Sequence, residues 1–209
     1  MSGSPAARRL ILASSNPGKL REFQVLAAGN AVEMDLLPVY AAVPEFPEDA
    51  PTFAENAAGK ALYYSKYSEE SVFADDSGLV VPALGGAPGV LSARYAGPGA
   101  SSEERNAKLL NELHGKNGVE RAAYFVCVIA LARGGRCEAV VSAKAEGEIL
   151  EAPRGGGGFG YDPVFFYPAL GKSFAELTAN EKNVHSHRGN AFRRLMEALE
   201  REAAESSRR

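Results

Sequence analysis

The alternation of apolar and polar residues near the start of the chain predicts a buried strand, a polar turn and a helix. Leu10–Ala13 is a short apolar run of the kind found in buried strands. In the polar turn Ser14–Lys19 that follows, Asn16 or Ser15 can cap a helix, and Pro17 suits its first turn. Apolar residues then recur at helical spacing, at Leu20, Phe23 and Leu26.

A second helix is predicted to begin at Thr52. Thr52 and Glu55 have the spacing of a capping box, in which each side chain binds the backbone N–H of the other. The buried side of this helix carries Phe53, Ala57, Ala61 and Tyr64. Beyond it, the apolar segments 71–74 and 79–81 flank Asp75–Gly78, which we interpret as an acidic turn between two strands.

The rest of the chain continues to mix predicted helices and strands. Leu84–Gly99 is rich in Gly and Pro and predicts an ordered loop, and Glu103–Leu113 predicts a helix. Residues 122–145 predict a hairpin that turns at Gly134–Gly135, and Asn190–Glu202 predicts a closing helix with one apolar face. No repeat or domain boundary is visible, so we expect residues 1–209 to form one α/β domain.

Composition and charge narrow the class of protein. Of the 209 residues, 45% are hydrophobic and 23% are charged, which is ordinary for a globular protein with a buried core. The formal net charge of −3 argues against non-specific nucleic-acid binding, which usually needs a basic surface. The two cysteines, Cys127 and Cys137, provide no disulfide framework or zinc ligand set, and the hairpin register sets Cys127 opposite Ser142.

The location of the protein can also be predicted. Residues 1–7 lack the apolar core of a signal peptide, and no stretch approaches the roughly 18 apolar residues of a membrane span. We therefore expect a soluble cytoplasmic protein without a membrane partner.

The acidic segment Asp75–Gly78 is a candidate magnesium site. Mg²⁺ often takes one or two carboxylates and completes its shell with water and phosphate oxygens, and the same carboxylate can orient or deprotonate water. The alternative is an ordinary Asp-rich turn. A second carboxylate could come from the proline-rich segment that contains Glu45, Glu48 and Asp49.

The turn Ser14–Lys19 is a candidate phosphate site, because a helix N-terminus presents N–H groups and Lys19 adds a full positive charge. The alternative is a capped helix with a solvated lysine. A Walker A loop is excluded: Gly171-Lys172-Ser173 has the right ending, but Phe166 stands where the leading glycine should be.

The glycine-rich string Gly155–Gly160 formally matches the dinucleotide fingerprint G-x-G-x-x-G. That fingerprint opens a helix directly after an early strand, whereas here the extended-looking segment Tyr161–Phe166 follows, late in the chain. We reject that interpretation and expect the glycines to let the backbone approach a ligand, with Phe159 or Tyr161 stacking on a base. The alternative is a loop with two core aromatic residues.

Basic residues before the predicted last helix could bind a nucleotide together, although each alone is more often a surface residue. They are Lys182, His187 and Arg188. For His185 we can name no partner.

With these residues assembled, the chain resembles the inosine-triphosphate pyrophosphatase family over residues 10–199. The resemblance is carried by six blocks in order: Ser14–Lys19, Thr52–Ala61, Ala74–Leu79, Leu84–Tyr95, Gly157–Phe165 and Lys182–Gly189. It implies an elongated α/β fold of two lobes, with a long central mixed β-sheet and a nucleotide cleft between the lobes. It also implies a homodimer that uses Mg²⁺ to hydrolyse ITP, dITP and XTP to the monophosphate and pyrophosphate, which cleanses the nucleotide pool.

The resemblance also implies roles for single residues. Asp76 matches the catalytic acid that binds the metal, Asp75 has a supporting place beside it, and Glu45 or its rival Glu48 matches the second metal carboxylate. The matched substrate-binding residues are Ser14, Ser15, Asn16, Pro17, Gly18 and Lys19 for the triphosphate, Lys60 near the phosphates, Ser77, and Phe159, Gly160, Tyr161, Asp162, Lys182, His187 and Arg188 for the base and sugar. Ser15 stands where many members carry glycine.

Two rival functions remain open from the sequence. One is that of the related septum-inhibitor-like nucleotide pyrophosphatases, against which the blocks around Phe159 and His187 argue. The other is a nucleotide-sensing module without turnover, against which the paired acidic site argues. Selection of a 6-oxo purine would need hydrogen-bond donors, for which His187 and Arg188 are candidates.

Overall fold

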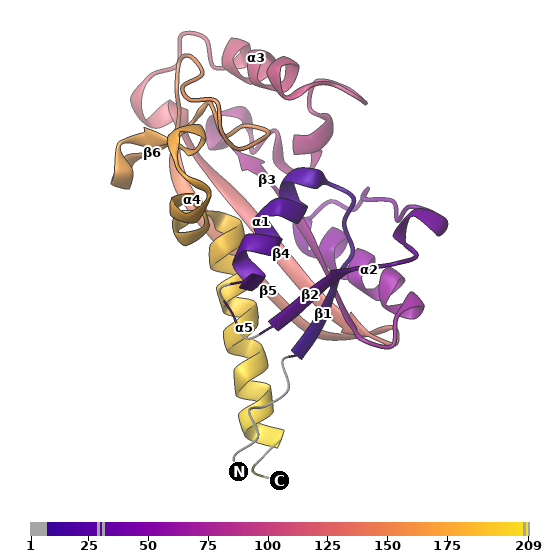
Figure 1. The fold of residues 1–209 in the computed structure, drawn as a ribbon. Coiled ribbons are helices and arrows are strands. Elements are labelled where there is room, and N and C mark those ends of the chain that lie inside the picture. Colours follow the sequence, from indigo (N-terminus) through magenta and orange to yellow (C-terminus); the bar gives the residue numbers. More distant parts are fainter. Residues whose placement is uncertain (1–7, 29, 31, 207, 209) are drawn as a thin grey trace. The chain divides into compact units, whose positions relative to one another are not determined.

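A computed structural model of the chain describes residues 8–28, 30, 32–206 and 208 (Figure 1). Residues 1–7, where no signal-peptide core is expected, lie outside this part of the chain. None of the helices in the described part combines the length and the apolar character that a membrane crossing requires.

The strands form one mixed sheet in the order β2-β1-β3-β4-β5-β6-β7. β1 pairs in parallel with both β2 and β3, whereas β6 pairs antiparallel with β5 and β7. The strands are β1 Arg8–Leu12, β2 Val32–Leu36, β3 Ser71–Val80, β4 Ala122–Arg133, β5 Arg136–Ile149, β6 Phe165–Tyr167 and β7 Lys172–Ser173. The prediction of an α/β protein with a mixed central sheet is confirmed.

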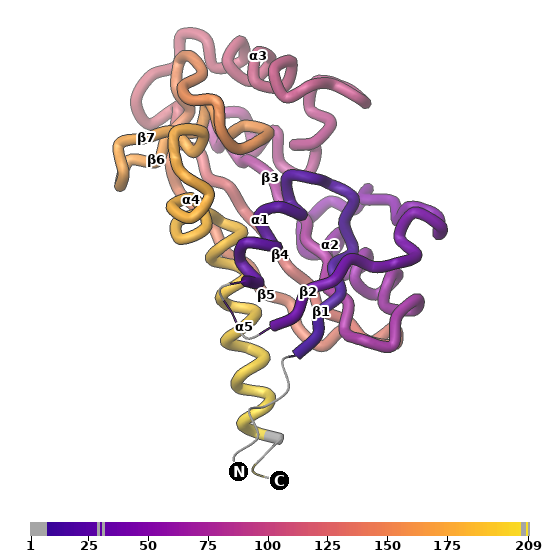
Figure 2. Tube along the Cα trace, in the orientation of Figure 1, coloured from indigo at the N-terminus to yellow at the C-terminus, as the bar shows by residue number. Residues whose placement is uncertain are grey.

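The chain divides into two compact units, which strands β3, β4 and β5 and the last helix connect (Figure 2). The first unit contains the described residues up to Asp76, the segment Val128–Val141 and the described residues from Phe192 onward. The second unit contains Ser77–Cys127 and Ser142–Ala191. The helices are α1 Pro17–Ala28, α2 Phe53–Tyr64, α3 Ser102–Glu112, α4 Ala179–His185 and α5 His187–Ser206. The elongated shape, the single domain and the cleft stay predictions.

Strand β3 overturns the predicted acidic turn. It runs without a break over Ser71–Val80, so Asp75 and Asp76 lie in the middle of a strand, 0% and 6% exposed. Local preference favours a turn at Asp-Asp-Ser-Gly, but pairing inside a sheet overrides it. The carboxylates are tolerated there because side chains from two helices contact them, a long-range effect that local sequence does not reveal.

Helix α1 packs on β3 through two matching spacings. Phe73 and Asp75, two residues apart on β3, face the same side of the sheet. Phe23 and Lys19, four residues apart on α1, form one helix face. The rings of Phe23 and Phe73 lie 5.2 Å apart, edge to face, and the Lys19 Nζ lies 3.0 Å from the Asp75 Oδ2. Core packing of α1 therefore also delivers a lysine to a buried carboxylate.

Helix α2 begins as predicted, but its cap differs in one bond. Thr52 Oγ1 accepts a hydrogen bond from the Glu55 N–H at 3.2 Å. The Glu55 carboxylate instead accepts from the Thr52 hydroxyl at 2.6 Å, so the predicted reciprocal capping box forms only in part.

The hairpin of β4 and β5 confirms the predicted turn. Gly134 and Gly135 have φ angles of 55° and 77°, the left-handed values that a two-residue turn of type I′ requires. Cys127 is buried, Cys137 is exposed, and both are free, as the hairpin register predicts.

The C-terminal helix starts earlier than predicted. α5 begins at His187, not at Asn190, so His187 and Arg188 form its first turn. Lys182 lies in α4, a short helix that the sequence analysis missed although Thr178 and Glu181 form a capping box at its start. The prediction that these basic residues precede the last helix is therefore wrong for His187 and Arg188, and all three lie at the junction of two helices.

Gly189 permits the close approach of α4 and α5. A Cβ atom at this position would overlap the carbonyl oxygen of Asn183. Alanine normally stabilises a helix interior by about 1 kcal/mol relative to glycine, whereas overpacking costs about 1–3 kcal/mol. Because the Cβ would lie far closer than 3.0 Å to this backbone oxygen, the cost falls at the upper end of that range. We therefore expect Gly189→Ala to lower the free energy of unfolding by about 2 kcal/mol, measured by urea denaturation.

Gly156→Ala is the matched control, because a Cβ there meets open space at an ordinary φ angle. Its stability should stay within about 0.5 kcal/mol of the wild type. Equal stability of the Gly189 variant and this control would contradict the packing argument.

Candidate functional site

The turn that joins β1 to α1 is capped by its own side chains. Asn16 Oδ1 accepts hydrogen bonds from the N–H groups of Gly18 at 2.9 Å and Lys19 at 3.1 Å, and Ser14 Oγ accepts from the Asn16 N–H at 3.3 Å. Asn16 rather than Ser15 is therefore the N-cap. An anion that used these N–H groups would have to displace the Asn16 side chain.

Lys19 and Asp75 form a buried ion pair. Lys19 Nζ lies 3.0 Å from Asp75 Oδ2 and also donates to the Asp75 backbone oxygen at 3.3 Å. The side chains are 12% and 0% exposed, so the pair is shielded from water on the carboxylate side. The alternative of a solvated Lys19 is thus excluded.

The Asp76 carboxyl has a raised pKa. Its Oδ2 accepts a hydrogen bond from Asn56 Nδ2 of α2 at 3.0 Å. Burial raises the pKa of Asp76 to about 6, and the nearby charge of Lys19 and the Asn56 bond only partly offset that effect. At neutral pH the carboxyl is mostly ionised, yet it titrates close enough to pH 7 to exchange a proton.

Lys60 of α2 links the segment before this helix to the acidic pair. Its Nζ forms an ion pair with Glu48, and its side chain is 7% exposed. Burial alone would lower the Lys60 pKa, but the charges of Glu48 and Asp75 outweigh burial and raise that pKa. Lys60 therefore stays protonated beside two carboxylates.

Glu45 and Glu48, the two candidates for the second metal carboxylate, differ in their position relative to Asp76. The charge of Glu48 is close enough to raise the pKa of Asp76. Glu45 is exposed and forms no hydrogen bond or ion pair with the described residues. Glu48, the rival in the sequence analysis, is the carboxylate that lies near Asp76.

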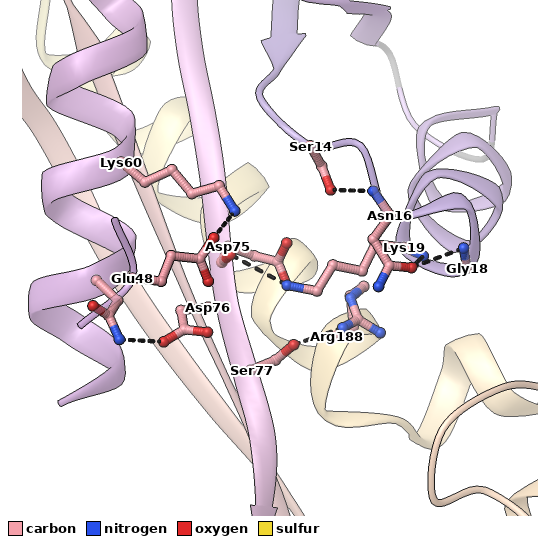
Figure 3. A network of polar contacts seen from close by, with 11 residues as sticks. Ser14, Asn16, Gly18, Lys19, Glu48, Lys60, Asp75, Asp76, Ser77 and Arg188 are labelled. Atoms are coloured by element: carbon pink, nitrogen blue, oxygen red, sulfur yellow. Dashed lines mark hydrogen bonds and ion pairs between the residues drawn. The ribbon is translucent and has the colours of Figure 1, made fainter. Parts of the chain in front are cut away.

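We call Lys19, Glu48, Lys60, Asp75 and Asp76 the acidic centre (Figure 3). Three carboxylates and two ammonium groups leave one negative charge in a largely buried place. Among the described residues no group of three or more His, Cys, Asp or Glu side chains is arranged to hold a metal by itself. The donor set fits a cation such as Mg²⁺, which takes one or two carboxylates plus water or phosphate oxygens.

The second unit holds the other predicted residues around the glycine-rich string. Asp162 Oδ2 accepts from the Phe159 N–H at 2.7 Å and from Lys182 Nζ at 2.5 Å. Lys182 Nζ and the Arg188 guanidinium lie 4.9 Å and 5.7 Å from the centre of the Phe159 ring. Arg188 also donates to the Ser77 hydroxyl at 2.8 Å. These residues therefore form one polar group around a half-buried ring.

Phe159 and Tyr161 have different environments. Tyr161 is 4% exposed, belongs to the apolar core of the second unit, and donates its hydroxyl to the Ser92 backbone oxygen at 2.9 Å. Phe159 is half-buried. Of the two, Phe159 has the exposure that stacking on a base requires.

The glycines of the string approach the chain's own backbone and side chains. Gly158 has a φ angle of +69°, and a Cβ there would overlap the Asp162 carboxylate. Gly157 donates its N–H to the Ala175 carbonyl at 3.0 Å. The glycines therefore allow the glycine-rich string to pack closely against neighbouring residues of the same chain.

His187 and His185 lie at the junction of α4 and α5. His187 is 4% exposed and its ring stacks on Phe125, with centroids 4.6 Å apart and planes 11° apart. His185, for which the sequence offered no partner, has its ring 5.5 Å from that of Tyr167.

Asn56 and Asn106 are polar residues that the sequence analysis missed. Asn106 of α3 is 6% exposed and donates its Nδ2 to the Gly160 carbonyl at 3.1 Å. Both side chains lie on the buried faces of helices. A polar residue among apolar helix positions was the only sequence signal available.

A family model for the Ham1 family matches residues 10–198. The chain belongs to the Ham1 family. The match covers all but the last residue of the region 10–199 in which the sequence shows the resemblance, and it includes both groups of polar residues.

Similar proteins and solved structures match almost the full length of the chain. A dITP/XTP pyrophosphatase of Geobacillus kaustophilus is 50% identical over 193 residues, which is 92% of this chain and 95% of that protein. A HAM1 protein of Coxiella burnetii has a TM-score of 0.82 at 41% identity, covering 93% and 99% of the two chains. A nucleoside-triphosphatase or dITP/XTP pyrophosphatase of Mycobacterium abscessus has a TM-score of 0.70 at 39% identity, covering 90% and 98%.

The raised pKa of Asp76 in this Ham1 chain leads to a prediction about the pH dependence of stability. The Asp76 carboxyl titrates near 3.8 when unfolded and about 6 when folded. Because the pKa of Asp76 is higher in the folded state, the protonated carboxyl contributes fully to stability below the unfolded pKa. This contribution is lost as the pH rises through the folded pKa. Asp76→Asn removes this charge, so we expect it to stabilise the protein by about 2 kcal/mol more at pH 8 than at pH 4.5, in urea denaturation.

Asp49→Asn, a change at an exposed carboxylate of the same unit, is the control and should show no such pH-dependent gain. A gain of equal size at both pH values, or a loss at pH 8, would show that Asp76 is not destabilised by its burial.

Proposed function

We propose that the chain is a nucleoside-triphosphate pyrophosphatase that hydrolyses deaminated purine nucleotides (dITP, XTP and ITP) to the monophosphate and pyrophosphate. The observation that carries this proposal is the acidic centre: a buried carboxylate with a pKa of about 6 beside a second carboxylate and two buried lysines. The names of two similar proteins, both called dITP/XTP pyrophosphatase, supply the substrate class.

Mg²⁺ fits the acidic centre, and Asp76 and Glu48 are the residues that would hold it. When bound, the ion would neutralise charge on the phosphates and on the bond that breaks. We prefer Glu48 to Glu45 as the second ligand because the charge of Glu48 raises the pKa of Asp76.

The chain's own residues supply positioning and proton transfer. Lys19 and Lys60 bring positive charge to the place where the triphosphate would lie. The Asp76 carboxylate would orient an attacking water and accept its proton. The pKa of about 6 applies to the metal-free protein, because a cation at this carboxylate favours the ionised form. Asn56 holds one oxygen of this carboxylate, which fixes its orientation. Positioning and electrostatic stabilisation should supply most of the rate.

We assign choice of base to the second unit. Phe159 would stack on the purine, and Arg188, which lies near this ring, and His187 would donate hydrogen bonds to a 6-oxo group. Adenine has an amino group at that position, so ATP would leave these donors unpaired and lose binding energy.

We further propose that the enzyme cleanses the nucleotide pool of the cytoplasm as a homodimer. The location and the homodimer rest on the family resemblance. The net charge of −3 favours free nucleotides over nucleic acid as partners.

The assay that tests the proposed function measures pyrophosphate release from ITP, XTP, GTP and ATP with and without Mg²⁺. We expect Mg²⁺-dependent release from ITP and XTP, with much slower release from ATP. Asp76→Asn should lower kcat by about 10²–10⁴-fold because the general base is lost, whereas the exposed Asp49→Asn should match the wild type.

Four outcomes would refute the assignment. Full activity of Asp76→Asn would remove the catalytic role of Asp76. Equal rates for ATP and ITP would contradict the proposal that hydrogen-bond donors select a 6-oxo purine. Turnover of dTTP with none of ITP would favour the septum-inhibitor-like pyrophosphatases, and binding of ITP without turnover would favour a nucleotide sensor.

The second carboxylate can be identified by paired substitutions. Glu48→Gln should raise the Mg²⁺ concentration for half-maximal activity at least about tenfold, because it removes a charged ligand beside Asp76. Glu45→Gln, the same change three residues earlier, should leave this concentration unchanged. The reverse ranking in the Mg²⁺ titration would assign the metal to Glu45.

A further inference from the structure

Residues 159–162, the Phe159 turn, bond mostly to one another and to the chain directly after them. Asp162 Oδ2 accepts from the Phe159 N–H at 2.7 Å, and the Asp162 N–H donates to the Phe159 carbonyl at 3.3 Å. The Tyr161 carbonyl accepts from two N–H groups slightly farther along the chain, both at 3.0 Å. The Gly160 carbonyl differs, because its bond comes from a distant helix: it accepts from Asn106 Nδ2 of α3 at 3.1 Å.

The carbonyl that Asn106 holds belongs to the central peptide of the Phe159 turn. Gly160 has a φ angle of +63°, whereas the φ angle of Tyr161 is negative. A left-handed glycine at the first central position alone is typical of a type II′ turn. The orientation of the peptide between the two central residues defines this turn type. By fixing that peptide, the bond from α3 also fixes the path of the chain at Phe159.

Helix α3, the Phe159 turn and the segment before α3 contact one another as a closed set. Tyr161 donates its hydroxyl to the Ser92 carbonyl at 2.9 Å. Arg105, next to Asn106 on α3, donates to the Ala93 carbonyl at 2.9 Å. The bond from Asn106 to the turn completes the set, so each of the three parts is held by the other two.

Strand β3 anchors this set beside the polar group of the second unit. Ser92 Oγ accepts from the Leu79 N–H of β3 at 2.9 Å. Two residues earlier on the same strand, the Ser77 hydroxyl accepts from Arg188 at 2.8 Å. The Phe159 turn is therefore held against the strand that also binds Arg188, a donor that we assign to the base.

Packing alone does not explain an asparagine at position 106. The side chain is 6% exposed, and Leu109, three residues later on the same helix face, belongs to the apolar core of the second unit. Among the described residues, none donates to Asn106 Oδ1, although this atom is buried. A buried acceptor without a partner lowers stability. The asset of this residue is therefore its NH₂ group, which holds the turn.

We propose that Asn106 is a positioning residue for base recognition: it fixes the central peptide of the Phe159 turn, so that the Phe159 ring is already placed to stack on the purine. This inference rests on the proposed function, because it assigns Phe159 to the base. Asn106 is buried and acts through the turn, without touching the nucleotide. Binding of the phosphates, which we assign to the acidic centre, should not depend on it.

The test compares a ligand that has a base with one that has none. Asn106→Leu keeps the branching of the side chain and removes the amide. Binding of ITP and of inorganic tripolyphosphate is measured by titration calorimetry in metal-free buffer. The variant should bind ITP about fivefold more weakly than the wild type, the change that one hydrogen bond makes. Its affinity for tripolyphosphate should be unchanged.

The same variant should show a split in steady-state kinetics with ITP and Mg²⁺. We expect KM to rise about fivefold with kcat unchanged, because stacking on the base contributes equally to the bound substrate and to the transition state. Urea denaturation should give a midpoint at or above that of the wild type, because a buried unpaired acceptor is removed. A merely structural role would lower this midpoint and reduce the binding stoichiometry for both ligands alike.

Two further variants control for packing. Asn111→Leu is the matched control, since Asn111 lies on the same helix but is exposed, and it should leave the affinity for both ligands unchanged. Asn106→Ala removes the amide without filling its place. It should give the same split between ITP and tripolyphosphate, so the result does not depend on how leucine packs.

The outcomes separate this inference from the proposed function. Unchanged ITP affinity in both Asn106 variants, an equal loss for ITP and tripolyphosphate, or equal affinity of the wild type for the two ligands would overturn the positioning role. If the split holds but no nucleotide is hydrolysed with Mg²⁺, the proposed function fails and the positioning role remains. If ITP is hydrolysed but the Asn106 variants bind it like the wild type, the reverse is true.

Discussion

The burial of two adjacent carboxylates in the middle of strand β3 is the constraint on which the rest of the site depends. A buried charge costs several kcal/mol unless neighbouring groups compensate it. Asp75 receives Lys19 from α1, and Asp76 receives Asn56 from α2. The two helices are therefore placed by core packing and by the need to satisfy these acids at the same time.

The compensation is incomplete at Asp76, and this is where chemistry becomes possible. Asp75 has a lysine 3.0 Å away, whereas Asp76 has a neutral amide as its hydrogen-bond partner and the charge of Glu48 nearby. Adjacent residues on one strand thus have opposite tasks. One is a neutralised structural acid, and the other is a destabilised acid that would gain from a cation or a proton.

The basic residues assigned to the nucleotide are held in advance by partners within the chain. Lys60 pairs with Glu48, Lys182 with Asp162, and Arg188 bonds Ser77. Such pairs fix long side chains before a ligand arrives, so less conformational entropy is lost on binding. A nucleotide would exchange these contacts for its own phosphates and base.

The sequence was sufficient where local signals and global packing agree. The strand at Leu10, the helix after Pro17 and the hairpin at Gly134–Gly135 follow from periodicity, capping and turn chemistry. It was insufficient where distant residues decide. An acidic tetrapeptide inside a strand, the core position of Tyr161 and the partner of Glu48 all depend on contacts made far along the chain.

The central claim is that burial leaves Asp76 destabilised as an anion, and its pKa tests that claim most directly. The carboxyl carbon of Asp76 can be titrated by NMR in metal-free buffer, with the signal assigned from Asp76→Asn. We predict a pKa of about 6, with burial as the main cause. A pKa below 4 would contradict the account, because Asp76 would then be a stabilised ion-pair acid without a proton to exchange near neutral pH.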